Sequence, residues 1–276
     1  MSPIVARLVS VLVALALWAA PAQAAPKAEL WPRWTAHDAA ATAAIDHRAW
    51  DAWLARYLAR DADGINRVGY GAVTADDRAT LDRYIAALAA ERIGGYARPE
   101  QMAYWINLYN ALTVQVVLAR FPVASIMDIK ISPGLFAPGP WGKKLVAVEN
   151  EMLSLDDIEH RILRPIWRDP RIHYVVNCAS IGCPNLAPRA YTAARLEAML
   201  DEAARDYVNH PRAAAIVEGK LVLSRIYDWY RDDFGTSDAG VIQHLAHYAG
   251  KELAAKLRGF NRISDYRYDW GLNVAR

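Results

Sequence analysis

Apolar residues recur at three- and four-residue steps in several parts of this chain, which is the spacing of one face of an α-helix. The pattern predicts helices over residues 35–60, 75–93, 99–120, 155–165, 192–207 and 241–257. Short apolar or alternating runs predict strands over residues 144–149, 174–176, 220–223 and 263–273. Long helices with a few short strands indicate an α+β fold that is mostly helical with a small β-sheet.

The predicted helix near 99–120 differs from the others because it is apolar nearly all round, so we expect it to be central and buried. Asn107 and Asn110 interrupt it three residues apart and therefore lie on one side. A buried amide is costly unless it finds hydrogen-bond partners. Two interpretations stay open: the amides satisfy the backbone of a neighbouring loop, or they orient a catalytic group and bind substrate.

Residues 1–24 have the pattern of a secretory signal peptide. Arg7 precedes the apolar run Leu8–Ala20, and Ala22-Gln23-Ala24 forms a small-x-small cleavage site. The sequence therefore predicts a periplasmic or secreted protein. The apolar run is shorter than the roughly 20 residues that a spanning helix needs, and no later segment is long and uncharged enough. We therefore expect no membrane span in the mature chain.

The rest of the chain reads as one domain in which an N-terminal helical part precedes a larger region. No flexible linker separates them, so we expect the two to pack as one unit. The 32 basic and 30 acidic residues give a net charge of +2, which is too balanced to indicate nucleic acid as a partner. We expect the partner to be a small molecule or peptide of unknown identity.

Both cysteines, Cys178 and Cys183, lie within the stretch 171–186, after an apolar run. In a first interpretation Cys178 is a nucleophile and a histidine is its base, since the thiolate is the reactive form. His173 lies five residues before Cys178, about 16 Å along a straight strand, which is too far for direct contact. His160 is therefore an equal candidate for the base.

In a second interpretation, Cys178 and Cys183 form a disulfide, because export makes oxidation available and the intervening loop contains Gly182. The spacing is not the C-x-x-C of thioredoxin-like enzymes. In a third, the cysteines bind a metal with Glu159 and either His160 or His173, but the spacing matches no zinc-finger or H-E-x-x-H pattern. We therefore predict no metal and no cofactor.

Glu159 lies inside the apolar stripe of the predicted helix 155–165, with His160 beside it. A carboxylate on a buried face must be paired, hydrogen-bonded or neutral. This position suits a carboxylate that orients a catalytic histidine.

Four segments of the chain carry a family signature. They read WINLYNALT at 105–113, LSLDDIEHRILR at 153–164, DPRIH through NCASIGCP at 169–184, and YDWGLN at 268–273. In this order they resemble the motifs of the DUF547 family, whose function is unknown. The resemblance implies the domain boundaries: it marks 96–276 as a DUF547-like domain, which an N-terminal helical segment, 25–95, precedes. Its motifs include Asn107, Asn110, Glu159, His160, His173, Cys178 and Cys183. Gly182 and Asn185 depart from it, since the family usually has serine and proline there.

The sequence supports two hypotheses about function. The first is an exported, thiol-dependent hydrolase or acyl transferase that acts on an amide-type bond. Its nucleophile is Cys178, with Cys183 as the alternative. His173 or His160 is the base, Glu159 orients it, and Asn107 or Asn110 donates hydrogen bonds to the substrate. The second is a non-enzymatic periplasmic binding or assembly module, stabilised by a Cys178–Cys183 disulfide.

Overall fold

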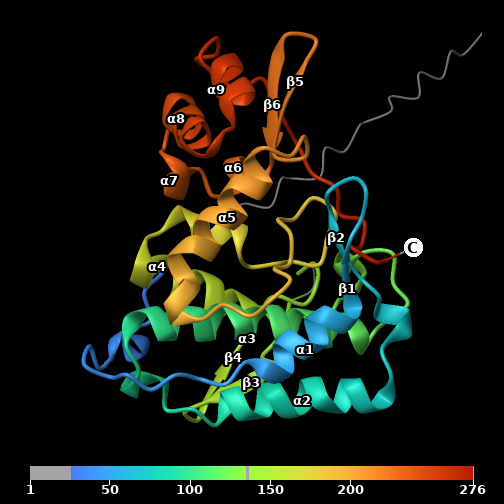
Figure 1. The fold of residues 1–276 in the computed structure, drawn as a ribbon, viewed down its shortest axis with the longest axis vertical. Coiled ribbons are helices and arrows are strands. Elements are labelled where there is room, and N and C mark those ends of the chain that lie inside the picture. The colour runs from blue at the N-terminus through green and yellow to red at the C-terminus, as the bar shows by residue number, and fades with distance from the viewer. Residues whose placement is uncertain (1–25, 135–136, 276) are drawn as a thin grey trace, which may run out of the picture.

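Three helices from the N-terminal half lie together at the base of the molecule in the view of Figure 1: α1 (Arg48–Tyr57), α2 (Ala75–Ala89) and α3 (Arg98–Leu118). The Thr74 side chain accepts a hydrogen bond from the Asp77 N–H and so caps the start of α2. Nearly every residue of α3 is buried. This confirms the central buried helix predicted near 99–120.

The computed structural model describes residues 26–134 and 137–275, so the signal peptide predicted for residues 1–24 lies outside the described residues. The other helical elements are shorter or belong to the C-terminal half. They are the 3₁₀ helices η1 (Pro32–Thr35), η2 (Tyr70–Ala72), η3 (Ile93–Gly95), η4 (Ile126–Asp128), η6 (Pro170–Tyr174) and η7 (Ala193–Arg195), the π-helical segment η5 (Asp157–Leu163), and the α-helices α4 (Arg164–Trp167), α5 (Leu196–Val208), α6 (Ile226–Trp229), α7 (Arg231–Phe234), α8 (Asp238–Tyr248) and α9 (Lys251–Leu257).

The strands form three small sheets within the described residues instead of the single sheet expected. Two are antiparallel pairs, β1 (Leu58–Arg60) with β2 (Asn66–Val68) and β3 (Val146–Val148) with β4 (Glu151–Leu153). The third has the order β5 (Ala214–Val217), β6 (Lys220–Ser224), β7 (Asp265–Arg267), antiparallel and then parallel. The α+β, mostly helical fold class is confirmed.

Two hydrophobic clusters make up the core. The larger surrounds α3, and the smaller lies among α5, β6 and α8 in the upper part of Figure 1. Helix α5 contributes to both, with Leu196 and Leu200 in the larger cluster and Tyr207 and Val208 in the smaller. The division into segments 25–95 and 96–276 stays a prediction.

The segment 174–176 is not the strand that its apolar residues predicted. Pro170 begins the 3₁₀ helix η6, and the Asp169 side chain accepts a hydrogen bond from the Arg171 N–H at its start. The chain therefore coils before it reaches Cys178, so the 16 Å estimate for a straight strand does not apply.

The predicted strand 263–273 is short as well: only β7 belongs to a sheet, and the residues after it pair with the cysteine loop. Ile181 N–H donates to the Gly271 carbonyl at 2.7 Å, and Gly182 N–H to the Asp269 carbonyl at 2.8 Å. An ideal Cβ on Gly182 would lie 2.8 Å from the Asp269 nitrogen, so a residue without a side chain suits this close approach.

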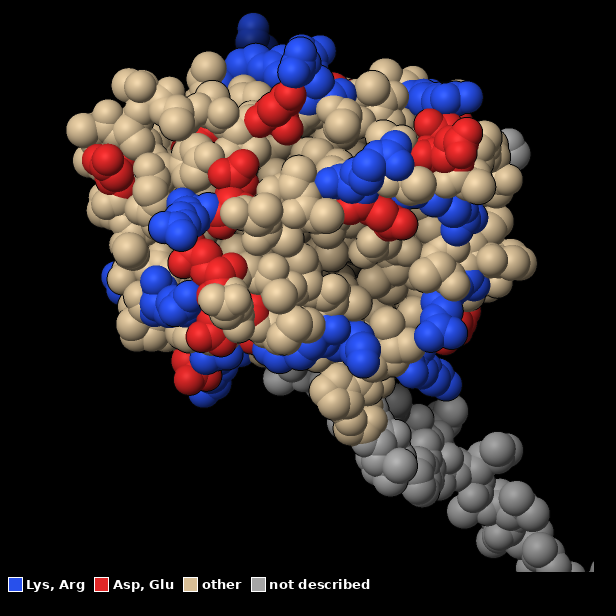
Figure 2. Space-filling model, turned by 90° about the horizontal axis from the view of Figure 1, so that it is seen from below, with Lys and Arg blue, Asp and Glu red and all other residues tan. Residues whose placement is uncertain are grey.

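None of the described helices is long and apolar enough to cross a membrane. On the face shown in Figure 2, basic and acidic side chains are interspersed among uncharged ones, without a field of a single sign. This distribution agrees with the small net charge of +2.

Candidate functional site

The asparagines of α3 hold two loops in place. Asn107 donates to the Tyr191 carbonyl at 2.8 Å and accepts from the Tyr191 N–H at 3.0 Å. Asn110 donates to the Val175 carbonyl at 2.9 Å and accepts from the Asn177 N–H at 2.8 Å. Asn107 and Asn110 have exposed fractions of 0% and 2%. The structure shows the first interpretation, in which both amides satisfy loop backbone, and the substrate-binding role expected for Asn107 and Asn110 stays a prediction.

Asn110 is the more important of the two for the site, because it fixes the segment that leads directly into Cys178. Asn177 continues the same network: its side chain accepts from the Ala179 N–H at 2.9 Å and donates to the Pro184 carbonyl at 2.7 Å. The backbone at Ala179 has a φ of +57°, so the chain turns sharply after Cys178. This turn brings Cys183 back beside Cys178.

Four side chains form what we call the thiol centre: Cys178, Ser180, Cys183 and Tyr268. The two sulfurs are free thiols 2.8 Å apart. The Cys178 Sγ also lies 3.0 Å from the Tyr268 hydroxyl and 3.3 Å from the Ser180 hydroxyl. The backbone N–H of Cys178 donates to the Cys183 Sγ at 2.9 Å. The predicted disulfide is not formed in this structure and stays a prediction.

The two thiols differ in exposure and in acidity. Cys178 is partly exposed and Cys183 is 4% exposed. Burial raises the pKa of Cys178, but hydrogen bonds from Cys183, Ser180 and Tyr268 outweigh it, and the pKa lies below its usual value. Burial, together with the neighbouring Cys178, raises the pKa of Cys183 well above the usual value. Cys178 is therefore the thiol that ionises first.

A second group of residues, which we call the acid–histidine cluster, surrounds His173. The His173 Nε2 lies 2.6 Å from the Asp233 Oδ2, and its Nδ1 lies 3.5 Å from the Glu159 Oε1, an ion-pair distance without hydrogen-bond geometry. The Arg164 Nε donates to the same Asp233 oxygen at 2.6 Å. The Tyr230 ring stacks on His173 with centroids 4.0 Å apart. Both nitrogens of His173 thus face carboxylates.

The π-helical turn η5 shapes this cluster. The Arg164 N–H donates to the Glu159 carbonyl five residues back, in place of the usual four. The Arg164 side chain donates to the His160 Nδ1 at 3.1 Å, and that nitrogen lies 3.9 Å from the Glu159 Oε1. This turn thereby brings Glu159, His160 and Arg164 beside His173. The helix predicted for residues 155–165 was an ordinary one and did not include a π-helical turn.

Burial and neighbouring charges set the ionisation of the cluster. For Glu159, burial opposes the charge, but His160, His173 and Arg164 outweigh it and lower the pKa to about 2. Burial lowers the pKa of His160 to about 4, so its ring is neutral at pH 7. Burial and the charge of Glu159 raise the pKa of Asp156, one turn earlier, to about 7.

Among the described residues no hydrogen bond joins the thiol centre to the acid–histidine cluster, although charges of both groups act on the same two tyrosines. Burial raises the pKa of both Tyr109 and Tyr230, and the charges of Glu159 and Cys178 raise it further in each case. Both groups are thus within electrostatic reach of the same two tyrosines. Within the described residues no histidine hydrogen-bonds either sulfur, so neither His173 nor His160 pairs directly with Cys178, and their role as base stays a prediction.

The sequence alone did not identify several members of these groups. Tyr268 belongs to the YDWGLN segment, which signalled the family but not a contact to Cys178. Asp233 and Tyr230 come from an aromatic and acidic stretch, 226–235, without a recognisable motif. Among the described residues, no group of three or more His, Cys, Asp or Glu side chains is placed to hold a metal ion.

Comparison with known families agrees with the motifs. The model of the DUF547 family, described as a protein of unknown function, matches residues 93–208. The matched region runs from just before α3 to the end of α5. It contains Glu159, His160, His173, Cys178 and Cys183, whereas Asp233 and Tyr268 lie beyond it. No curated protein and no solved structure gives a significant match. Residues 93–208 of the chain therefore form a DUF547 domain.

Proposed function

We propose that this protein is an exported dithiol that exchanges with disulfides, with Cys178 as the attacking thiol and Cys183 as the resolving thiol. The observation that carries the proposal is the asymmetry of the pair: the sulfurs lie 2.8 Å apart, one partly exposed and one buried. Hydrogen bonds lower the pKa of Cys178 against the effect of burial, whereas burial is the main cause that raises the pKa of Cys183. An accessible thiolate beside a buried thiol is the arrangement that such exchange uses.

The reaction balances within the pair. The Cys178 thiolate attacks a substrate disulfide, forms a mixed disulfide with one of its sulfurs and releases the other as a thiolate. Cys183 then loses its proton and attacks the Cys178 sulfur, which forms the internal disulfide and releases the second substrate thiolate. The substrate is reduced by two electrons and the pair is oxidised by two. A disulfide bond is about 2.05 Å long, so closure requires a small approach of the two sulfurs.

The surroundings favour Cys178 as the attacking group. Hydrogen bonds from the Tyr268 and Ser180 hydroxyls stabilise a Cys178 thiolate. The signal-peptide pattern of residues 1–24 supports a periplasmic or secreted location, where disulfide substrates are available.

The test compares Cys178→Ser with Cys183→Ser by intact mass after incubation with oxidised glutathione. We expect Cys183→Ser to accumulate a glutathione mixed disulfide and Cys178→Ser to react much more slowly. The unmodified pair should end as an internal disulfide, with the loss of two hydrogens. Equal reactivity of the two variants, with both folded by circular dichroism, would contradict the assignment of roles.

A second candidate is the thiol-dependent hydrolase or acyl transferase, with Cys178 as nucleophile and an amide-type bond as substrate. The observation that favours it is that the charges of Cys178 and of Glu159, which faces His173, both raise the pKa of Tyr109 and of Tyr230. Cys183→Ser separates the two candidates. It abolishes the closing step of disulfide exchange but leaves a single-thiol hydrolase active on an activated ester or amide.

The non-enzymatic alternative, a binding or assembly module with a structural Cys178–Cys183 disulfide, makes a different prediction. Its bridge should resist reduction by glutathione while the protein stays folded, because structural disulfides have low reduction potentials. A bridge that opens and closes with the glutathione ratio supports exchange instead.

A further inference from the structure

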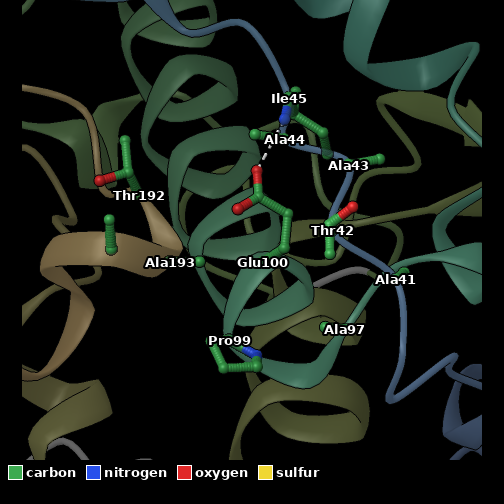
Figure 3. A pocket seen from close by; sticks show the side chains of 11 residues that line it. Ala41, Thr42, Ala43, Ala44, Ile45, Ala97, Pro99, Glu100, Thr192 and Ala193 are labelled. Atoms are coloured by element: carbon green, nitrogen blue, oxygen red, sulfur yellow. Dashed lines mark hydrogen bonds between the residues drawn. The ribbon is translucent and has the colours of Figure 1, made fainter.

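A cavity of about 320 Å³ opens at the N-terminal end of α3. Three segments line it: residues 41–45, the start of α3 with Ala97, Pro99 and Glu100, and residues 192–194 at η7 (Figure 3). None of its lining residues belongs to the thiol centre or the acid–histidine cluster. The volume is at the lower end of the range of small-ligand pockets, about 300–1,000 Å³.

Glu100 provides the only ionisable side chain in the lining. It is 4% exposed, and its Oε1 accepts a hydrogen bond from the Ile45 N–H at 2.7 Å. Within the described residues the Glu100 Oε2 has no hydrogen-bond or ion-pair partner. This oxygen is not among the fully buried atoms that lack a partner, so it keeps some access to the cavity. Figure 3 shows the carboxylate in the middle of the lining residues, with this second oxygen directed into the cavity.

The elements around Glu100 supply a helix terminus but no cationic side chain that pairs with its carboxylate within the described residues. It lies in the first turn of a long helix, where the helix dipole stabilises an anion. The adjacent Arg98 is engaged elsewhere, since its guanidinium donates to the Gln101 Oε1 at 2.8 Å and to the Trp34 carbonyl at 3.4 Å. A nearly buried carboxylate oxygen without a donor is costly, and a cationic donor in the cavity removes that cost.

We propose that this cavity binds the primary ammonium group of a small aliphatic ligand. The walls are mostly alanine methyl groups, which suit a short alkyl chain, and Glu100 supplies the acceptor. An anionic ligand would meet like charge, and a neutral apolar one would cover Oε2 without a hydrogen bond. Metal ions such as Ca²⁺ take about six to eight oxygen ligands, and a single carboxylate does not supply them.

Two sources offer this chemistry: a free alkylamine, or the N-terminal ammonium of a peptide with small side chains. Calorimetric titration of the protein with butylamine, Ala-Ala-Ala and N-acetyl-Ala-Ala-Ala distinguishes them, and 1-butanol serves as the uncharged control. Tighter binding of Ala-Ala-Ala than of butylamine assigns a peptide N-terminus. Tighter binding of butylamine assigns a free amine. The proposal is overturned if 1-butanol or the acetylated peptide binds as strongly as butylamine and Ala-Ala-Ala. It is also overturned if neither butylamine nor Ala-Ala-Ala binds.

Glu100→Gln is the decisive variant, because its amide oxygen still accepts from the Ile45 N–H while the charge is lost. We expect amine binding to weaken at least about tenfold. Ala193→Leu, which fills the cavity beside Glu100, should block binding independently. Glu252→Gln is the matched control, since that side chain is 84% exposed. Amine binding that both Glu100→Gln and Ala193→Leu leave unchanged overturns the site. The outcome does not depend on the cysteines, so it is separable from the test of thiol exchange.

Discussion

Tyr268 reaches the thiol centre from 90 residues farther along the chain, and its hydroxyl lies 3.0 Å from the Cys178 Sγ. It also lies 2.9 Å from the Ser180 hydroxyl. A donor that stabilises the thiolate more than the thiol lowers the pKa of the sulfur. The acidity of Cys178 thus depends on Cys183 and Ser180 within the cysteine loop and also on a hydroxyl group outside it.

Removing that hydroxyl with Tyr268→Phe should raise the pKa of Cys178. We expect slower alkylation by iodoacetamide at pH 7 and a shift of the rate–pH profile to higher pH, because less thiolate is present. Tyr266→Phe is the matched control, since its hydroxyl accepts from Arg231 and has no contact with a sulfur. An identical profile for Tyr268→Phe and the unmodified protein would show that this donor does not act on Cys178.

At the scale of elements, α3 supports the site from below through its two asparagines. Asn110 holds the segment before Cys178, whereas Asn107 makes a nearly identical clamp on Tyr191, away from the sulfurs. The helix therefore offers a pair of matched positions, of which only one leads into the thiol centre.

Asn110→Ala and Asn107→Ala should each lower the free energy of unfolding by about 2–5 kcal/mol, because each leaves a buried backbone N–H and a carbonyl without a partner. Only Asn110→Ala should also change the alkylation rate of Cys178. Chemical denaturation gives the stability, and iodoacetamide kinetics on the folded protein give the thiol reactivity. The idea that Asn110 positions the cysteine loop is contradicted if both variants alter that rate equally.

The elements differ in how far the sequence could predict them. The all-round apolarity of 99–120 and the Thr74 cap are local signals, and α3 and α2 appear as expected. The π-helical turn η5 was not predictable, because Leu155, Ile158 and Ile162 fit an ordinary helix equally well. The strand predicted at 174–176 failed because the turn chemistry of Asp169 and Pro170 decided the backbone.

In the candidate site, too, local motifs were predictable from the sequence and long-range contacts were not. Its cysteines, Glu159 and both histidines came from motifs, but Asp233 and Tyr268 meet them only through the packing of the C-terminal region. Contacts between residues so far apart leave no periodic signal in one sequence. The buried amides Asn107 and Asn110 were recognised as unusual, while the partners that explain them were not visible.

At the scale of the whole molecule, buried titratable groups link stability to pH. Burial lowers the pKa of His47, His160 and His244 to about 4 each. All three are neutral in the folded protein at pH 5 but protonated in the unfolded chain, so unfolding takes up protons there. Asp156 has the opposite effect: burial raises its folded pKa to about 7, so it releases about one proton on unfolding at pH 5.

The net uptake predicts that the free energy of unfolding falls as the pH drops from about 6.5 towards 4, by about 2 kcal/mol per pH unit near pH 5. Urea denaturation at several pH values measures this slope. His47→Gln should reduce this slope by the contribution of roughly one proton, even if the variant is less stable overall. A slope that does not change in His47→Gln would mean that His47 is protonated in the folded state.

The pairing of residues 269–273 with the cysteine loop has a consequence for how the protein matures. During synthesis the ribosome adds Cys178 well before Tyr268, since 90 residues separate them. At about 5–20 residues per second, this interval lasts several seconds. Until the later segment docks, Cys178 lacks the phenol that favours its thiolate, and its loop lacks the backbone hydrogen bonds to Asp269 and Gly271. The lowered pKa of Cys178 is therefore a property of the folded chain, which arises only once residues 269–273 have docked on the cysteine loop.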